Sequence, residues 1–303
     1  NKIIEIGSND GTFSFYFFKN KFNILGFEPS LNVAKVARKK KLKVISKFFN
    51  YKNVSKLRSY KKNTDLICAA NVICHIPNLK DLIKSIDFLL SDKGVFIFEE
   101  PYLGSMFKKI SYDQIYDAHV FIFSLHSVRS IFNSYGFELV NAFPQKTHGG
   151  SMRYVISRKN SRSISKNIKK LIQNEKKLKL NDISSCIKFK KNCELSKKNF
   201  RSKILKFKKE GKIICGYAAS AKSTTALNYC QINHNHIDYI ADSTKEKTGK
   251  FTPGTHIPVV SINYFRKNYP DIVILCSWNH KKEIMEKEKE FKKKGGKWIS
   301  HVK

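Results

Sequence analysis

Apolar positions along the first half of the chain alternate between two spacings. Short runs rich in β-branched residues, such as residues 3–6, predict strands buried on both faces. Between these runs, apolar residues recur at helical spacing, most clearly over residues 79–90. The predicted strands lie at 3–6, 22–27, 42–46, 65–69 and 95–99, and the predicted helices between them lie at 13–19, 32–40, 54–61 and 79–90.

Two further strands, at 137–143 and 151–157, follow a helix predicted over 125–135 and lie close together around a turn. Alternating strands and helices indicate a parallel α/β sheet, and the two adjacent strands indicate a terminal hairpin with one reversed strand. This combination is typical of the class I methyltransferase fold, a Rossmann-like α/β architecture. We therefore predict a domain of this class over residues 1–158.

The rest of the chain predicts two further segments. Residues 159–210 are rich in Lys and Ser, contain no glycine, and have apolar residues at helical spacing, which predicts a helical connector of two helices. Residues 211–303 again alternate strands with helices. They predict a second, smaller Rossmann-like α/β domain at the C-terminus. Its small-residue turn and the Asp at the end of its second strand are typical of nucleotide binding, so an NAD site is one interpretation.

A polar turn that contains two glycines follows the first strand. Strand, glycine turn and helix N-terminus together direct backbone N–H groups toward a ligand. Glu28 ends the second strand, where an acid suits the hydroxyls of a ribose. The turn lacks G-x-G-x-x-G and contains Asp10, which would repel a pyrophosphate. This favours S-adenosylmethionine (SAM), bound by Gly7, Asp10, Gly11 and Glu28; the alternative is an ordinary turn with a solvated acid.

Further polar candidates lie after the fourth and fifth strands, where open α/β sheets bind ligands. Asn71 and His75 follow the fourth strand, and Glu99 and Glu100 end the fifth; we assign Asn71 to the cofactor and His75 to catalysis. A long excursion then includes Tyr116 and His119, which would share one face of a helical turn. A His beside a Tyr hydroxyl can remove a proton and stabilise an oxyanion. The alternative is that both side chains are structural.

Composition narrows the class of protein. The formal charge of +34 invites a nucleic-acid partner, but the Lys residues are spread along the chain without interleaved aromatics, so we expect a solvated surface and no nucleic acid. No run of about 18 apolar residues exists, so we expect no membrane span. Seven Cys residues without C-x-x-C argue for the cytoplasm and against a metal site within this chain.

Several motifs resemble those of the nucleotide-sugar C-methyltransferases, which methylate a carbon next to a ketone in deoxysugar biosynthesis. The matches occur in family order and span nearly the whole chain. They are E-I-G-S-N-D-G-T (5–12), F-E-P-S (27–30), A-N-V-I-C-H-I (70–76), E-E-P-Y-L (99–103), I-Y-D-A-H (115–119), F-S-L (123–125), T-H-G-G-S-M-R (147–153), G-Y-A-A-S-A-K-S-T-T-A-L-N-Y-C (216–230), P-G-T-H-I-P (253–258) and S-W-N (277–279).

This resemblance implies a mechanism and a substrate. His119 matches the family's general base, Tyr116 its neighbouring tyrosine, and His75 a histidine near the substrate. The partner would be a nucleotide-diphosphate keto-deoxysugar, and the C-terminal domain would bind it. The residues that the resemblance assigns to this substrate are His148, Arg153, Lys222 and Asn228.

Three features depart from the family pattern. Ala118 stands where the family has a glutamate, and Gly and Pro are replaced in the turn at 216–225. The family's cysteine-rich zinc module is absent, and the chain opens on a core strand at Asn1, so we expect a segment upstream. Three alternatives stay open: O- or N-methylation of a nucleotide sugar, an RNA-binding protein of methyltransferase ancestry, and a catalytically inactive scaffold.

Overall fold

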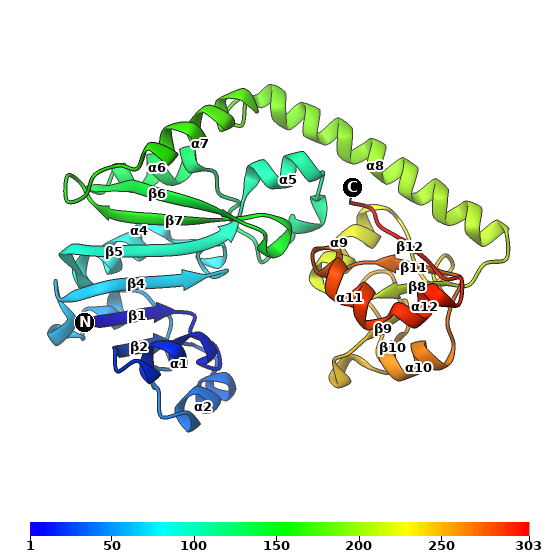
Figure 1. Cartoon of the computed structure of the whole chain (residues 1–303), viewed down its shortest axis with the longest axis horizontal. Helices are drawn as coiled ribbons and strands as arrows, with labels where there is room; N and C mark the ends of the chain where they lie inside the picture. The colour runs from blue at the N-terminus through cyan, green and yellow to red at the C-terminus, as the bar shows by residue number, and fades with distance from the viewer. Residues whose placement is uncertain (303) are drawn as a thin grey trace. The chain divides into compact units, whose positions relative to one another are not determined.

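The structure is a computed structural model that describes residues 1–302. The chain divides into two compact units, each made of two segments (Figure 1). The first unit comprises Asn1–Gly104 and Ala118–Asn181, and the second comprises Ser105–Asp117 and Asp182–Lys303. Each unit has its own sheet, and each is described separately below.

Seven strands form the sheet of the first unit, in the order β3-β2-β1-β4-β5-β7-β6. β7 runs opposite to the other strands of this sheet, and it pairs antiparallel with β5 on one side and β6 on the other. This strand order confirms the predicted class I methyltransferase fold with its terminal hairpin. The strands are β1 (Lys2–Ile6), β2 (Asn23–Phe27), β3 (Lys43–Ile45), β4 (Thr64–Ala70), β5 (Leu90–Pro101), β6 (Phe137–Gln145) and β7 (Ser151–Arg158).

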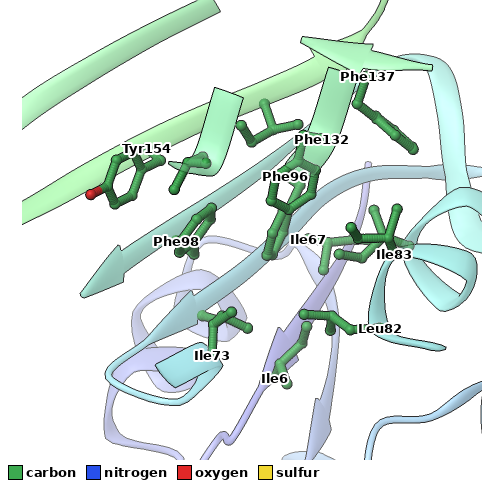
Figure 2. Close-up of a cluster of buried hydrophobic side chains, with 14 of the residues drawn as sticks. Ile6, Ile67, Ile73, Leu82, Ile83, Phe96, Phe98, Phe132, Phe137 and Tyr154 are labelled. Carbon is green, nitrogen blue, oxygen red and sulfur yellow. The ribbon is translucent and has the colours of Figure 1, made fainter. Parts of the chain in front are cut away.

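Helices cover the sheet because each has an apolar face that matches the apolar strands. Figure 2 shows Phe96 of β5 close to Phe132 of α6, with Ile67 of β4 facing Ile83 of α4; the two phenyl centroids lie 5.9 Å apart. All four of these side chains are buried. The helices of this unit are α1 (Thr12–Lys19), α2 (Leu31–Lys39), α3 (Tyr51–Val54), α4 (Leu79–Leu89), α6 (Leu125–Asn133) and α7 (Lys166–Lys177).

The helix predicted at 54–61 is replaced by α3 and a short 3₁₀ turn, Arg58–Tyr60. The shift has a local cause, because the Asn50 side chain accepts a hydrogen bond from the Asn53 backbone N–H and so begins the helix earlier. The structure therefore places a capped helix N-terminus in the connection between β3 and β4.

The predicted connector at 159–210 is not a separate segment, because α7 belongs to the first unit and α8 (Ile183–Lys209) to the second. Glu175 of α7 explains the first assignment. Its buried carboxylate accepts hydrogen bonds from the Tyr102 hydroxyl at 2.9 Å and from the Leu125 backbone N–H at 2.6 Å. A buried acid bonded in this way ties the helix to its neighbours.

The excursion after β5 was predicted as part of the first domain, but its segment Ser105–Asp117 packs with the second unit. It contains the C-terminal part of α5 (Leu103–Lys109). Asp113 provides the reason: its fully buried carboxylate accepts a hydrogen bond from the Trp278 indole N–H at 2.8 Å and lies 3.4 Å from the His301 ring.

The second unit contains a five-stranded parallel sheet in the order β10-β9-β8-β11-β12. This confirms the predicted second Rossmann-like domain. The helical segment at 281–293 is divided into two helices, because buried Glu288 at the break binds the Tyr217 hydroxyl and the Arg266 guanidinium. The remaining elements are β8 (Ile214–Tyr217), α9 (Ala221–Tyr229), β9 (Tyr239–Asp242), β10 (Val259–Ser261), α10 (Ile262–Lys267), β11 (Ile272–Leu275), α11 (Lys281–Lys287), α12 (Lys289–Lys293) and β12 (Lys297–Ile299).

Two further predictions from composition can be compared with residues 1–302. Among the helices described there, none combines the length and apolar character needed to cross a bilayer. All seven cysteines lie within this range and have free thiols. The cytoplasmic location stays a prediction.

Glu5 is an acid buried in the centre of the first sheet. It is 7% exposed, and burial raises its pKa from 4.5 to about 7, against a hydrogen bond from Ser14 that lowers it. Between these two pH values the folded chain holds a proton that the unfolded chain has lost. Stability should therefore fall as pH rises from about 4.5 to about 7.

We expect Glu5→Gln to remove this pH dependence. As pH rises from 4.5 to 8, the free energy of unfolding of the variant should increase relative to that of the wild type. The increase is about 3 kcal/mol at most, which corresponds to a pKa difference of about 2.5. Urea unfolding at both pH values measures the change. Glu246→Gln, which alters an exposed acid, is the matched control. An equal effect of Glu5→Gln at both pH values would contradict the prediction.

Candidate functional site

A cavity of about 890 Å³ lies at the carboxyl ends of β1, β2 and β4 in the first unit. This is the edge of a parallel sheet at which ligands are expected. Of the residues predicted for the cofactor or catalysis, Gly7, Glu28, Asn71 and His75 line it. Its lining also includes the aromatic rings of Phe48 and Phe49, which the sequence analysis missed. The signal was their position just past the end of the third strand.

Gly7 allows close packing at the tip of β1. Its φ of +68° is unfavourable for other residues, and a Cβ there would lie 2.4 Å from Val72 Cγ2. The backbone N–H groups of Gly7 and Ser8 both donate to the Phe27 carbonyl, at 2.8 and 3.0 Å. These two N–H groups therefore join the ends of β1 and β2, although the sequence predicts that they face a ligand.

Glu28 is fixed by two backbone donors at the end of β2. Its Oε2 accepts from Asn9 N–H at 3.0 Å, and its Oε1 accepts from Ser30 N–H at 2.8 Å. Each carboxylate oxygen retains acceptor capacity for a second donor. A carboxylate held in this way at the cavity wall suits the two hydroxyls of a ribose.

Asp10 and Gly11 are not among the residues that line the cavity, so their assignment to the cofactor stays a prediction. The Asp10 carboxylate accepts from Thr12 and pairs with the Lys40 ammonium at 3.0 Å; these bonds lower its pKa, with the Thr12 hydroxyl as the largest cause. Gly11, with φ of +76°, packs where a Cβ would lie 2.3 Å from Leu42 Cδ1. Both residues therefore shape the turn into α1.

Asn71 presents an unsatisfied acceptor at the cavity. Its backbone N–H donates to the Glu99 carbonyl at 2.9 Å, and its φ is +56°. Its side-chain Oδ1 is buried and has no hydrogen-bond partner within residues 1–302. Buried acceptors are normally paired, so this atom fits a ligand that brings N–H or O–H donors. SAM has such donors in its adenine, ribose and ammonium groups.

The loop after Asn71 is held by Glu100. This fully buried carboxylate accepts from the backbone N–H groups of Val72 at 2.9 Å and Ile73 at 2.6 Å, and burial raises its pKa. The sequence analysis placed Glu100 among the groups near a ligand. The structure instead uses its bonded oxygen to position the loop that contains Asn71 and His75.

Two imidazole rings lie together beside this loop. The His75 and His119 ring centroids are 5.1 Å apart. His75 Nδ1 lies 2.5 Å from the Ala118 carbonyl oxygen, which can only accept, so Nδ1 has the hydrogen and Nε2 has the lone pair in the neutral ring. The structure thus brings together two of the three predicted catalytic residues, one of which lines the cavity.

The helical turn predicted to join Tyr116 and His119 is not formed. A 3₁₀ turn occurs earlier, at Tyr112–Gln114, and residues 116–119 form a bend and an irregular turn. The anchoring of Asp113 by Trp278 and His301 explains where the helical turn lies. Tyr116 belongs to the second unit and His119 to the first.

Arg153 has a structural partner in Glu99, and its assignment to a diphosphate stays a prediction. Its guanidinium donates to Glu99 Oε2 at 2.8 and 3.1 Å, and the Thr147 hydroxyl donates to Glu99 Oε1 at 2.6 Å. This network ties the turn between β6 and β7 to the end of β5. His148 lies in that turn with φ of +51°.

The two candidates in the second unit differ in their surroundings. The Lys222 ammonium nitrogen is buried without a hydrogen-bond partner among the described residues, and burial is the main cause of its lowered pKa. It lies 5.4 Å from the centre of the Trp278 ring. By contrast, the Asn228 amide donates to the Pro253 carbonyl at 3.1 Å, so Asn228 holds the loop at 253–258.

The sequence is similar to one curated relative, C-methyltransferase NovU from Streptomyces niveus. The two are 27% identical over 298 residues, which cover 98% of this chain and 71% of NovU. Solved structures also resemble about half of the chain. The PH0226 protein of Pyrococcus horikoshii OT3 has a TM-score of 0.42 at 18% identity and covers 52% of this chain and 82% of its own.

A second solved structure is magnesium protoporphyrin IX methyltransferase from Synechocystis PCC 6803 with bound SAM. Its TM-score is 0.39 at 13% identity, covering 52% of this chain and 69% of its own. The fold assignment rests on the strand order and not on these distant similarities.

We expect Asn71→Gly to weaken SAM binding by about 5–30-fold, which corresponds to the 1–2 kcal/mol of one lost hydrogen bond. Glycine keeps the left-handed backbone while it removes the amide. Isothermal titration with SAM measures the effect. Asn160→Gly, at an exposed position with φ of +63°, is the control and should bind SAM as the wild type does. Unchanged affinity in Asn71→Gly would show that Oδ1 does not contact SAM.

Two family models match adjacent parts of the chain. A methyltransferase domain matches residues 1–142, and a C-methyltransferase C-terminal domain matches residues 146–302, which is more than half of the chain. Together with the strand order and the cavity at the tips of β1, β2 and β4, they identify an enzyme. The chain therefore belongs to the SAM-dependent C-methyltransferases.

Proposed function

We propose that this enzyme methylates the carbon next to a ketone in a nucleotide-linked deoxysugar, with His119 as the general base. The observation that supports this most directly is the position of His119 beside the cavity-lining His75, with ring centroids 5.1 Å apart. An aliphatic carbon needs a base before it can attack a methyl group, and imidazole is the side chain that most often serves as one near neutral pH.

The residues of the cavity suit SAM. Glu28 would accept from the ribose hydroxyls, and Asn71 Oδ1 would accept from an N–H or O–H of the cofactor. The Phe49 ring, which is buried in the cavity wall, would pack against a flat apolar surface such as adenine. When bound, SAM supplies an electrophilic methyl group.

The base acts on the substrate before the methyl group is transferred. In its neutral form, His119 takes the proton from the carbon next to the ketone and leaves an enolate. General-base catalysis of this kind contributes about 10²–10⁴-fold to the rate. The carbon of the enolate is then the nucleophile, and the proton stays on the imidazole until product leaves.

His75 and Tyr116 have separate supporting roles. His75 is held by the Ala118 carbonyl, so its Nε2 can accept a hydrogen bond from a sugar hydroxyl and orient the substrate. For Tyr116 the support is its similarity in sequence to the family's tyrosine, and its hydroxyl would donate to the enolate oxygen.

Lys222 is the best-supported contact to the diphosphate. Its buried ammonium has no hydrogen-bond partner in the part of the chain that the structure describes, and an anionic oxygen would satisfy it. Asp113 is a nearby negative charge, and Lys109 a nearby positive one. His148 has weaker support, and the contacts of Arg153 and Asn228 to Glu99 and Pro253 argue against a ligand role for either residue.

One second candidate keeps the same family fold but methylates an oxygen or nitrogen of a nucleotide sugar. Ala118 favours it, because the family's glutamate beside the base is missing here. Neither O- nor N-methylation needs removal of a carbon-bound proton. Solvent exchange at that carbon therefore separates the two candidates.

We expect His119→Asn to lose about 10²–10⁴-fold in turnover on a keto-deoxysugar nucleotide and to lose exchange of the carbon-bound proton with D₂O. NMR measures the exchange, and labelled SAM measures methyl transfer across a panel of keto-sugar nucleotides. SAM binding should be unchanged, because His119 is not among the cavity-lining residues.

His126→Asn is the matched control, since His126 is an exposed histidine of the same unit. It should keep both exchange and transfer. Full turnover by His119→Asn would remove the assignment of the base. Methyl transfer to an oxygen or nitrogen without exchange would favour the second candidate.

A further inference from the structure

We propose that Cys74, His75 and His119 form a binding site for a divalent metal ion of intermediate softness, Zn²⁺ above all, and that the ion inhibits methyl transfer. One ligand atom from each residue lies within 4.8 Å of the other two. All three residues belong to the first unit. The inhibition rests on the proposed role of His119, whereas the binding of the ion does not.

The ligand set suits this class of metal ion. The three donors are one sulfur and two imidazole nitrogens. Zn²⁺ and Co²⁺ bind such donors well, whereas Mg²⁺ prefers oxygen ligands. Tetrahedral zinc with bonds of about 2.0–2.3 Å needs donors about 3.3–3.6 Å apart. Donors within 4.8 Å therefore need only small side-chain rotations to reach that geometry.

The site is partly oriented before any ion binds. The hydrogen bond from His75 Nδ1 to the Ala118 carbonyl leaves Nε2 as the donor atom, as the backbone partners of metal-bound histidines do. Cys74 lies beside His75 on a loop that Glu100 holds through Val72 and Ile73. The Glu100 carboxylate is also next to the Cys74 thiol, so an acid is present to balance part of a cation's charge.

Three protein ligands leave a tetrahedral ion one open position. A neutral imidazole has one basic lone pair, so an ion bound to His119 would leave that ring no nitrogen to accept the substrate proton. It would therefore compete with the reaction directly, even while Glu28 and Asn71 remain able to hold SAM. Sequence spacing did not indicate this site, because Cys74 and His75 are adjacent and His119 is far along the chain.

Titration with Co²⁺ tests the site without an assay of activity. The wild type should bind one equivalent with a thiolate-to-cobalt charge-transfer band in the near ultraviolet, and Zn²⁺ should abolish the band. Cys74→Ala and Cys74→Ser should both lose the band and bind Co²⁺ at least tenfold more weakly. Two variants are used because one could fail to fold, and thermal unfolding identifies such a failure.

Cys186→Ser is the matched control, because Cys186 is an exposed free cysteine of the second unit. It should keep the band. A band that persists in both Cys74 variants, a band lost in Cys186→Ser, or no charge-transfer band in the wild type would each overturn the proposal.

Activity then separates this proposal from the proposed function. Zn²⁺ should inhibit methyl transfer by the wild type, and Cys74→Ala should need at least tenfold more Zn²⁺ for the same inhibition. Equal sensitivity of the two proteins would overturn the inhibitory role. If no tested sugar nucleotide is methylated without metal, the proposed substrate fails, while the cobalt spectra still decide whether the site exists.

Discussion

The loop that follows β4 depends on one buried carboxylate from the neighbouring strand. Glu100 accepts hydrogen bonds from two successive backbone N–H groups, those of Val72 and Ile73, just where the strand pairing of β4 has ended. Removal of that acceptor would leave two buried donors unpaired, at a cost of about 1–3 kcal/mol each. A residue of β5 thus positions this part of the cavity wall, whose side chains belong to the loop after β4.

Strand order and helix positions could be predicted because local patterns determine them. Alternation of β-branched runs with helix-spaced apolar residues recurs through both units, and the resulting sheets bury those residues. The errors lie where a single polar contact between residues far apart in the sequence determines which unit a segment joins. Glu175 draws α7 to the first unit, and Asp113 draws the excursion after β5 to the second, although no local pattern marks either contact.

The residues that line the candidate site were predicted only in part, for the same reason. Glu28, Asn71 and His75 line the cavity because the carboxyl ends of parallel strands share one edge of a sheet. Asp10 was predicted there as well, but a lysine thirty positions away pairs with it, and sequence alone does not reveal that partner. Arg153 likewise pairs with Glu99 across a strand register that only the antiparallel β7 establishes.

The acceptor that orients His75 is a main-chain carbonyl, and this has a consequence for how the site can diverge. Any amino acid at position 118 offers the same oxygen, so mutation there leaves the tautomer of the neighbouring imidazole intact. The side chain at this position can therefore change, or take part in binding a new substrate, while the His75 ring keeps its orientation. The alanine found here provides this carbonyl oxygen.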